Sequence, residues 1–168
     1  MTFVIPLLLL ATSAGSPVSP SVRVHHEVSR HLCEIVAGPE LELLLGRLLT
    51  SREAGSACQY VARDGSEAQV IVSRQQLPSK LNLREEAKNL SEAMPGSSLH
   101  PVNGLGSAAW LLNLGPAGVQ LHILRGDSEY LLVSVLGFGD AALVTNPAQS
   151  IASRLLTRTS PTSSAQTF

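Results

Sequence analysis

Along the chain, segments whose hydrophobic residues have the spacing of a helix face are interspersed with short β-rich segments. A helix is expected from about residue 38, because Gly38-Pro39 suits a first helical turn, where the missing N–H of proline would have no partner anyway. Leucines then recur at the i, i+3, i+4, i+7 spacing of one helix face, which predicts a stripe packed into the core. The stripe consists of Leu41, Leu44, Leu45 and Leu48.

Five short β-rich runs are separated by turn residues. Asp64-Gly65 joins the first two and favours a tight hairpin, because glycine accepts the positive φ that the turn needs. The connections among the last three runs are too short for a parallel crossover, which predicts an antiparallel meander. The five predicted strands are residues 57–63, 68–74, 108–113, 119–125 and 129–136.

Two further helices are marked by the residues at their ends. Asn82 and a glutamate three residues later form a capping box, and a Pro-Gly pair at 95–96 ends the helix that follows. Asn146 and Pro147 supply a cap and a first-turn proline for a last helix that ends near residue 158. The predicted apolar faces are Leu83, Ala87, Leu90 and Met94 in the first of these helices, and Ala148, Ile151, Ala152 and Leu155 in the second.

These elements predict an α+β fold in the order α-β-β-α-β-β-β-α. We expect an antiparallel sheet of about five strands, made of a hairpin plus a three-stranded meander, packed against helices. A single domain is expected over residues 31–158, since a chain of this length can bury one core. Residues 15–30 are expected to form a flexible N-terminal arm, and the Ser/Thr-rich residues 159–168 a disordered tail.

The N-terminus of the chain predicts export. Residues 3–11 form an uncharged hydrophobic run that is too short to span a membrane, and the small residues after it suit cleavage behind Ala14. Residues 1–14 are therefore interpreted as a signal peptide, which predicts a secreted or periplasmic protein without a transmembrane anchor. The first charged residue is Arg23, so the usual positive start of a signal peptide is missing. A buried N-terminal element of a cytosolic domain is the alternative.

Export would place the two cysteines of the chain in a compartment where a disulfide can form. Disulfides persist in oxidising compartments, so Cys33 and Cys58 are predicted to form one. This bond would link the start of the first helix to the first strand. A pair of redox-active thiols is the alternative, although such thiols usually stand in a Cys-x-x-Cys arrangement that this chain lacks.

Charge argues against nucleic acid as a partner. The chain has 12 basic and 13 acidic residues and a net charge of -1, so no field attracts DNA, RNA or an anionic membrane. The stretch from Gly104 to Ala109 matches a dinucleotide-binding fingerprint only in its letters, because a predicted strand follows the glycines where a helix is needed. No cofactor is expected.

Histidines supply the only sequence cluster of metal-ligand residue types. The His-Glu-x-x-His pattern of zinc proteases is missing from it, so no metal site is predicted and an exposed polar arm is the interpretation. His100, beside a proline in a turn, and His122, on one strand face with Gln120, are expected to face solvent. The weak metal candidates are His25, His26 and His31.

Several sequence features can be compared with known families. Cys33 precedes a leucine-rich helix, Cys58-Gln59-Tyr60 opens a hairpin, and Val102-Asn-Gly-Leu-Gly-Ser-Ala-Ala-Trp110 opens a three-stranded meander. In these features residues 31–157 resemble exported bacterial domains of unknown function of the DUF3558-like, PsbP-like type. The resemblance implies an antiparallel sheet backed by helices, a disulfide between the two cysteines and no established activity. Many such proteins are lipid-anchored through an N-terminal cysteine that this sequence lacks.

The sequence contains no recognisable catalytic constellation. It lacks a Gly-x-Ser-x-Gly nucleophile elbow and a phosphate-binding loop. We therefore expect an exported, non-catalytic domain that binds a protein, an envelope component or a small ligand. The alternative is an extracytoplasmic metal-dependent enzyme that uses the histidine-rich arm. The candidate aromatic contacts of the binding domain are Tyr60, Trp110 and Tyr130, although such residues more often pack in cores.

Overall fold

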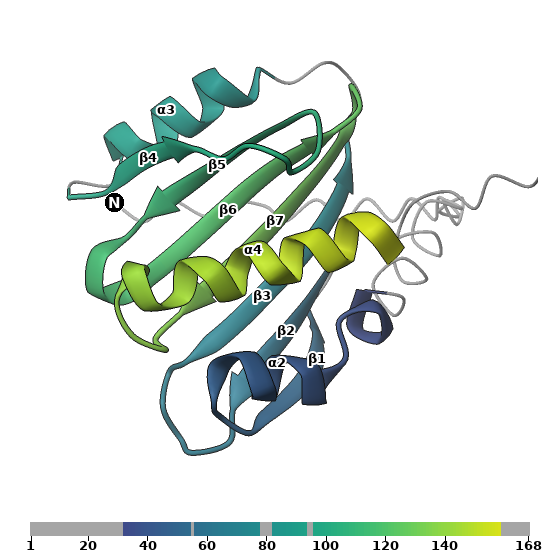
Figure 1. The fold of residues 1–168 in the computed structure, drawn as a ribbon, viewed down its shortest axis with the longest axis vertical. Helices are drawn as coiled ribbons and strands as arrows, with labels where there is room; N and C mark the ends of the chain where they lie inside the picture. The colour runs from purple at the N-terminus through teal and green to yellow at the C-terminus, as the bar shows by residue number, and fades with distance from the viewer. Residues whose placement is uncertain (1–31, 55, 78–81, 94–95, 159–168) are drawn as a thin grey trace, which may run out of the picture.

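The computed structural model describes residues 32–54, 56–77, 82–93 and 96–158, and one antiparallel sheet organises this part of the chain (Figure 1). Its seven strands lie in the order β1-β2-β3-β7-β6-β5-β4. They are β1 (Leu49–Ala54), β2 (Ala57–Ala62), β3 (Gln69–Gln76), β4 (Ser98–Pro101), β5 (Ala108–Asn113), β6 (Gly118–Arg125) and β7 (Glu129–Leu136). The helices are α2 (Gly38–Leu45), α3 (Leu83–Ala93) and α4 (Ala141–Arg158), with a short 3-10 helix, η1 (Gly115–Ala117). The predicted signal peptide, arm and tail lie outside the described residues.

The sheet consists of two antiparallel units that meet at its centre. Strands β1 to β3 follow one another as neighbours, and strands β4 to β7 do the same. Strand β7 lies beside β3, with Val70 opposite Val135 and Val72 opposite Val133. Strands β1 and β4 therefore form the two edges, and β3, β7 and β6 lie in the middle.

One face of the sheet carries the hydrophobic core. Helix α4 crosses β6 and β7 on this face, and α2 lies on the same side beside β1 (Figure 1). Full burial of a branched aliphatic side chain contributes about 1.5–3 kcal/mol, so this layer dominates the stability of the fold. Its fully buried members include Val70, Val72, Val119, Leu121, Ile123, Leu131, Val133, Val135, Ala148, Ile151, Ala152 and Leu155, all 0 % exposed.

The end of α4 is tied to the start of α2 by charged side chains. Arg154 donates to the carboxylate of Glu40 at 2.6 Å, and Arg158 donates to it at 3.2 Å. Arg158 also donates to the carbonyl of Ile35 at 2.6 Å. The hydrogen bond from Arg158 is the main cause that lowers the pKa of the Glu40 carboxyl. These contacts hold the two helices together over the core face.

The opposite face is more polar, and α3 covers one end of it. Helix α3 lies against β4, β5 and β6. Leu112 of β5 belongs to this face and is fully buried. At the other end, Arg52 donates to Gln59 at 2.7 Å, and Gln59 donates in turn to Gln69. Polar groups of β1, β2 and β3 therefore satisfy one another on the face away from the core.

The expectation of about five strands in the order α-β-β-α-β-β-β-α is wrong. The two strands that it lacks are the edges, β1 and β4. Residues 50 to 53 of β1 are exposed on both faces, so they show no hydrophobic alternation. Strand β4 has four residues and ends at Pro101, whose missing N–H is tolerated only at an edge. Edge strands with one neighbour leave a weaker pattern than central strands do.

Two further predictions about helices are wrong. Leu48 does not belong to the core stripe, because α2 ends at Leu45, where Gly46 adopts a left-handed conformation with φ 66°, and Leu48 is 63 % exposed. Helix α4 begins at Ala141, five residues before the predicted cap, since the Asp140 carboxylate accepts from the N–H of Leu143 at 3.2 Å. Pro147 therefore lies inside the helix.

Other elements follow the sequence closely. Strands β5 and β7 have the predicted bounds, and Gly65 has the positive φ, 78°, that its hairpin turn requires. Asn82 caps α3, accepting from the N–H of Glu85 at 3.3 Å. Met94, Pro95 and the side chains of Leu83, Ala87 and Leu90, predicted to line and end α3, lie outside what the structure describes. Among the described helices, none has the length and apolarity to cross a membrane.

Candidate functional site

An open cleft of about 510 Å³ lies where α3 meets strands β4 and β5. Leu99 and Pro101 of β4 and Trp110 of β5 provide its apolar lining, and Arg84 and Lys88 of α3 provide its charged lining. The β4–β5 register places Pro101 opposite Trp110. The cleft therefore joins an aromatic surface to two cationic side chains.

Trp110 is the tryptophan of the chain and is partly exposed in this cleft. It alternates along β5 with Ala109 and Leu111, which are buried on the core face. An indole that is only half covered offers a flat apolar surface with a polar N–H at its edge. Trp110 is thus the predicted aromatic contact that lines this cleft.

The two cations belong to one face of α3. Arg84 and Lys88 are four residues apart, a spacing that brings side chains together on a helix. Lys88 lies 3.6 Å from Glu92, but both side chains are well exposed and such a pair stabilises a helix by only about 0.3–0.5 kcal/mol. Arg84 has no ion-pair partner within the described part of the chain. Both cations can therefore turn toward a bound anion.

A buried histidine lies beside the floor of the cleft. His122 of β6 is directly opposite Trp110 in the β5–β6 pair, and it is only 3 % exposed. Its Nδ1 lies 2.6 Å from the hydroxyl oxygen of Tyr130 on β7. The expectation that His122 faces solvent is wrong, because α3 covers this end of the face. His100, on β4, is exposed as expected, and its Nε2 lies 2.9 Å from the Ser98 hydroxyl.

Burial keeps the His122–Tyr130 pair uncharged. It lowers the pKa of His122 to about 4, because the charged imidazolium would lose its hydration. It also raises the pKa of Tyr130 to about 12, with a smaller contribution from the negative charge of Glu86 on α3. At neutral pH the imidazole is therefore neutral and the phenol keeps its proton.

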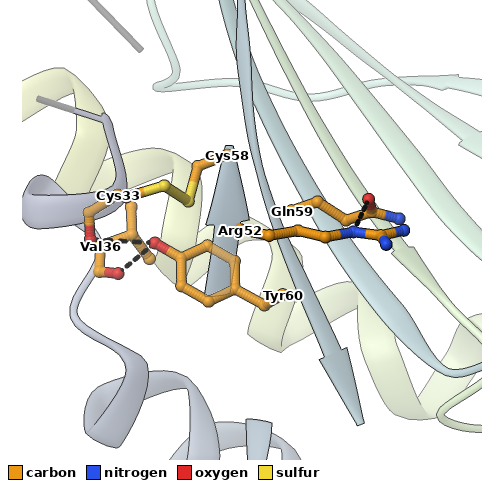
Figure 2. The surroundings of a disulfide bond; sticks show 6 residues. All are labelled: Cys33, Val36, Arg52, Cys58, Gln59 and Tyr60. Carbon is orange, nitrogen blue, oxygen red and sulfur yellow. Dashed lines mark hydrogen bonds between the residues drawn. A yellow bond between two sulfur atoms is a disulfide. The ribbon is translucent and has the colours of Figure 1, made fainter. Parts of the chain in front are cut away.

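Tyr60, the third predicted aromatic contact, belongs to the core. It is 0 % exposed, and its hydroxyl donates to the carbonyl of Val36 at 2.5 Å and lies 3.2 Å from that of Cys33 (Figure 2). Burial raises the pKa of this hydroxyl. Cys33 and Cys58 form the predicted disulfide beside it, with their Cα atoms 5.2 Å apart. Figure 2 shows the Gln59 side chain leaving β2 on the side opposite to Tyr60. The strand pairing puts Gln59 on the same face of the sheet as Trp110, so Tyr60 and Trp110 lie on opposite faces.

The predicted metal candidates His25, His26 and His31 lie outside the described residues. Within the described residues, no group of three His, Cys, Asp or Glu side chains could hold a metal ion. Sequence reasoning singled out Trp110 and Tyr130 but missed Arg84, Lys88 and His122. In the sequence, Arg84 and Lys88 alternate with Glu85 and Glu92, a pattern typical of a solvated helix face, and only the fold brings that face over β5.

No family model, no curated protein and no solved structure matches the chain. The resemblance to exported bacterial domains of the DUF3558-like, PsbP-like type stays a prediction. The interpretation of the cleft therefore depends on its own geometry and charge.

Proposed function

We propose that the protein is an exported, non-catalytic domain that binds a small amphipathic anion in the cleft between α3 and β5. The apolar body of the ligand would lie on Trp110, Leu99 and Pro101, and its charged head would lie near Arg84 and Lys88. The observation that carries the proposal is the cleft itself, where one half-exposed indole faces two cations. Apolar surface supplies affinity and a few placed charges supply orientation in sites of this kind.

The charged lining of the cleft favours binding over catalysis. Arg84 and Lys88 are cationic side chains, and neither acts as a nucleophile or a general base in that form. His122 is the nearest acid–base group, but it is buried and held by Tyr130. The metal-dependent alternative would need the histidine arm, so nothing in the described residues favours it.

Two features support export. The N-terminal run has the length and flanking small residues of a signal peptide. The Cys33–Cys58 disulfide would persist in an oxidising compartment and is rare in reducing ones. An extracytoplasmic role suits a domain that captures a small amphipathic molecule from its surroundings.

Intrinsic fluorescence tests the proposal directly, because Trp110 is the single tryptophan. The oxidised protein is titrated with dodecanoate below its micelle concentration, with dodecanol as the uncharged comparison. We expect a saturable change in emission for dodecanoate and affinity about tenfold weaker in an Arg84→Gln/Lys88→Gln variant, the loss of about 1.4 kcal/mol. Arg52→Gln, which removes a cation from the far end of the same face, should leave the affinity unchanged. Absence of saturation, or equal binding of dodecanol, would contradict the proposal.

A further inference from the structure

The buried imidazole beside the cleft has one nitrogen without a partner. His122 Nε2 is buried and forms no hydrogen bond with any described residue. Leaving a buried polar atom unpaired is costly, and native proteins do so at few places, often where a ligand or water completes the bonding. The unpaired nitrogen is therefore an observation separate from the shape and charge of the cleft.

The hydrogen-bond network assigns this nitrogen the role of a donor. If Tyr130 donates to Nδ1, the imidazole carries its proton on Nε2 and only that N–H lacks a partner. If Nδ1 instead donated to Tyr130, both the phenolic proton and the Nε2 lone pair would lack partners. The first arrangement leaves fewer buried groups unsatisfied, so His122 presents an N–H donor.

His122 lies next to the cleft without lining it, and its Nε2 is buried. Trp110, His122 and Leu132 are consecutive cross-strand neighbours on β5, β6 and β7, and their side chains share the face that α3 covers. Directly opposed residues have Cβ atoms about 4.5–5.5 Å apart, so the imidazole adjoins the indole floor. Arg84 and Lys88 extend from α3 at the rim of the cleft, whereas the neutral N–H donor of His122 extends from the sheet.

We propose that a ligand bound in the cleft uncovers His122 and accepts a hydrogen bond from its Nε2 at a neutral oxygen, the ligand being an amphipathic anion with a hydroxyl or carbonyl group along its apolar body. The inference rests on the proposed function. A second charge at this position is disfavoured, because His122 is buried and the carboxylate of Glu86 acts on the adjoining Tyr130. The ligand thus has a charged head at the rim and an uncharged oxygen at the sheet.

A series of probes that differ only in one oxygen tests this inference. Dodecanoate is compared with 3-, 6-, 9- and 12-hydroxydodecanoate, so that the unknown spacing from head to donor is sampled. We expect at least one hydroxy acid to bind wild type about tenfold more tightly than dodecanoate. In His122→Phe this preference should disappear while dodecanoate itself still binds. His122→Gln, whose amide offers a donor at a similar position, should keep part of the preference.

The outcomes separate the two proposals. Failure of every probe to bind contradicts the proposed function and the inference with it. Binding of dodecanoate with equal affinity for all the hydroxy acids, or a preference that survives His122→Phe, overturns the inference alone and indicates a water molecule or a structural role for Nε2. If His122→Phe does not fold, the ¹⁵N–¹H resonance of the imidazole in wild type decides. A downfield shift of the Nε2 proton with the preferred hydroxy acid, and not with dodecanoate, is the expected result, and an unchanged resonance contradicts it.

Discussion

The two faces of the sheet use neighbouring residues of the same strands for different purposes. On β6, Val119, Leu121 and Ile123 are fully buried beneath α4, whereas Gln120, His122 and Leu124 point to the face that α3 partly covers. The core face is made mainly of buried aliphatic side chains. The other face combines a half-exposed indole, an unpaired imidazole nitrogen and two cations.

The covering helices differ in the same way. Helix α4 presents the buried residues Ala148, Ile151 and Leu155 to the sheet and is tied to α2 through Glu40. Helix α3 carries charge along its described surface, with Arg84 and Lys88 at the cleft and acidic residues between and beyond them. The comparison indicates that the core face determines stability and that the α3 face determines binding.

The largest expected effect on stability comes from truncating adjacent residues of β6. Ile123→Ala should lower the free energy of unfolding by about 2–5 kcal/mol, because it leaves a cavity in the fully buried layer. Leu124→Ala, on the other face and partly exposed, should cost about 1–2 kcal/mol. Urea unfolding of both variants measures the difference, and equal losses would break the distinction between the faces.

Removing the disulfide should affect stability without affecting the cleft. Cys33 and Cys58 are 25 residues apart in sequence, so a Cys33→Ala/Cys58→Ala variant should lose about 3–4 kcal/mol in the chain-entropy description. The bond lies on the core side of β2, far along the sheet from β5. Dodecanoate affinity of the folded variant should therefore match wild type. A variant of unchanged stability and weakened affinity would reverse the assignment of the faces.

Acid should destabilise the protein through the α3 face. The unfolded His122 takes up a proton near its ordinary pKa of 6.5, but burial lowers its pKa in the fold to about 4. Between these values the unfolded state binds more protons, so stability falls as pH falls. From pH 6.5 to 5 the loss should be about 2 kcal/mol. Carboxylates such as Glu40 contribute little to the change in this window. Their lowered pKa stabilises the fold, and that stabilisation is lost only at lower pH.

Replacing the imidazole isolates the contribution of His122 to the pH dependence of stability. His122→Phe should remove most of the dependence between pH 6.5 and 5, measured by urea unfolding at each pH. The groups that face His122 are Tyr130 of β7, which stays protonated there, and, by way of Tyr130, Glu86 of α3. A pH profile that is the same in the variant as in wild type would show that His122 is accessible to water in the fold.

A smaller effect is expected from Tyr60→Phe. The substitution removes the hydroxyl that donates to Val36 and leaves a buried carbonyl without that donor, which should cost about 1–2 kcal/mol. The hydroxyl and the disulfide both hold residues 33–36 to β2, so the two losses should not add. Thermal unfolding of the single and combined variants measures this coupling. Strict additivity would show that the two contacts act independently.

The sequence predicted the elements that are marked by apolar runs between turn residues or by a one-sided helix face. Strands β5 and β7 are largely apolar runs between turn residues, and the Ala148, Ile151, Ala152 and Leu155 face of α4 is fully buried as expected. The edge strand β1 could not be predicted this way, because residues 50–53 are exposed and carry no alternation. Pro147 misplaced the start of α4, since a proline typical of a first turn lies in the helix interior.

The candidate site was harder to predict than the fold. Residue type alone points to Trp110 and Tyr130, and it points equally to Tyr60, which hydrogen-bonds within the core. His122 was assigned to the correct face of its strand but not to burial, because covering by α3 depends on contacts remote in sequence. The same packing places Arg84 and Lys88 over β5. Such sites emerge only when the helix is docked on the sheet.

Amide ¹⁵N–¹H spectra recorded during a dodecanoate titration test the division of the two faces most directly. We predict shifts that saturate together and are confined to α3, β4, β5 and the neighbourhood of His122, with α2 and α4 unchanged. Shifts centred on α2, on its exposed Leu43 and on the exposed Leu48 that follows the helix would contradict the account.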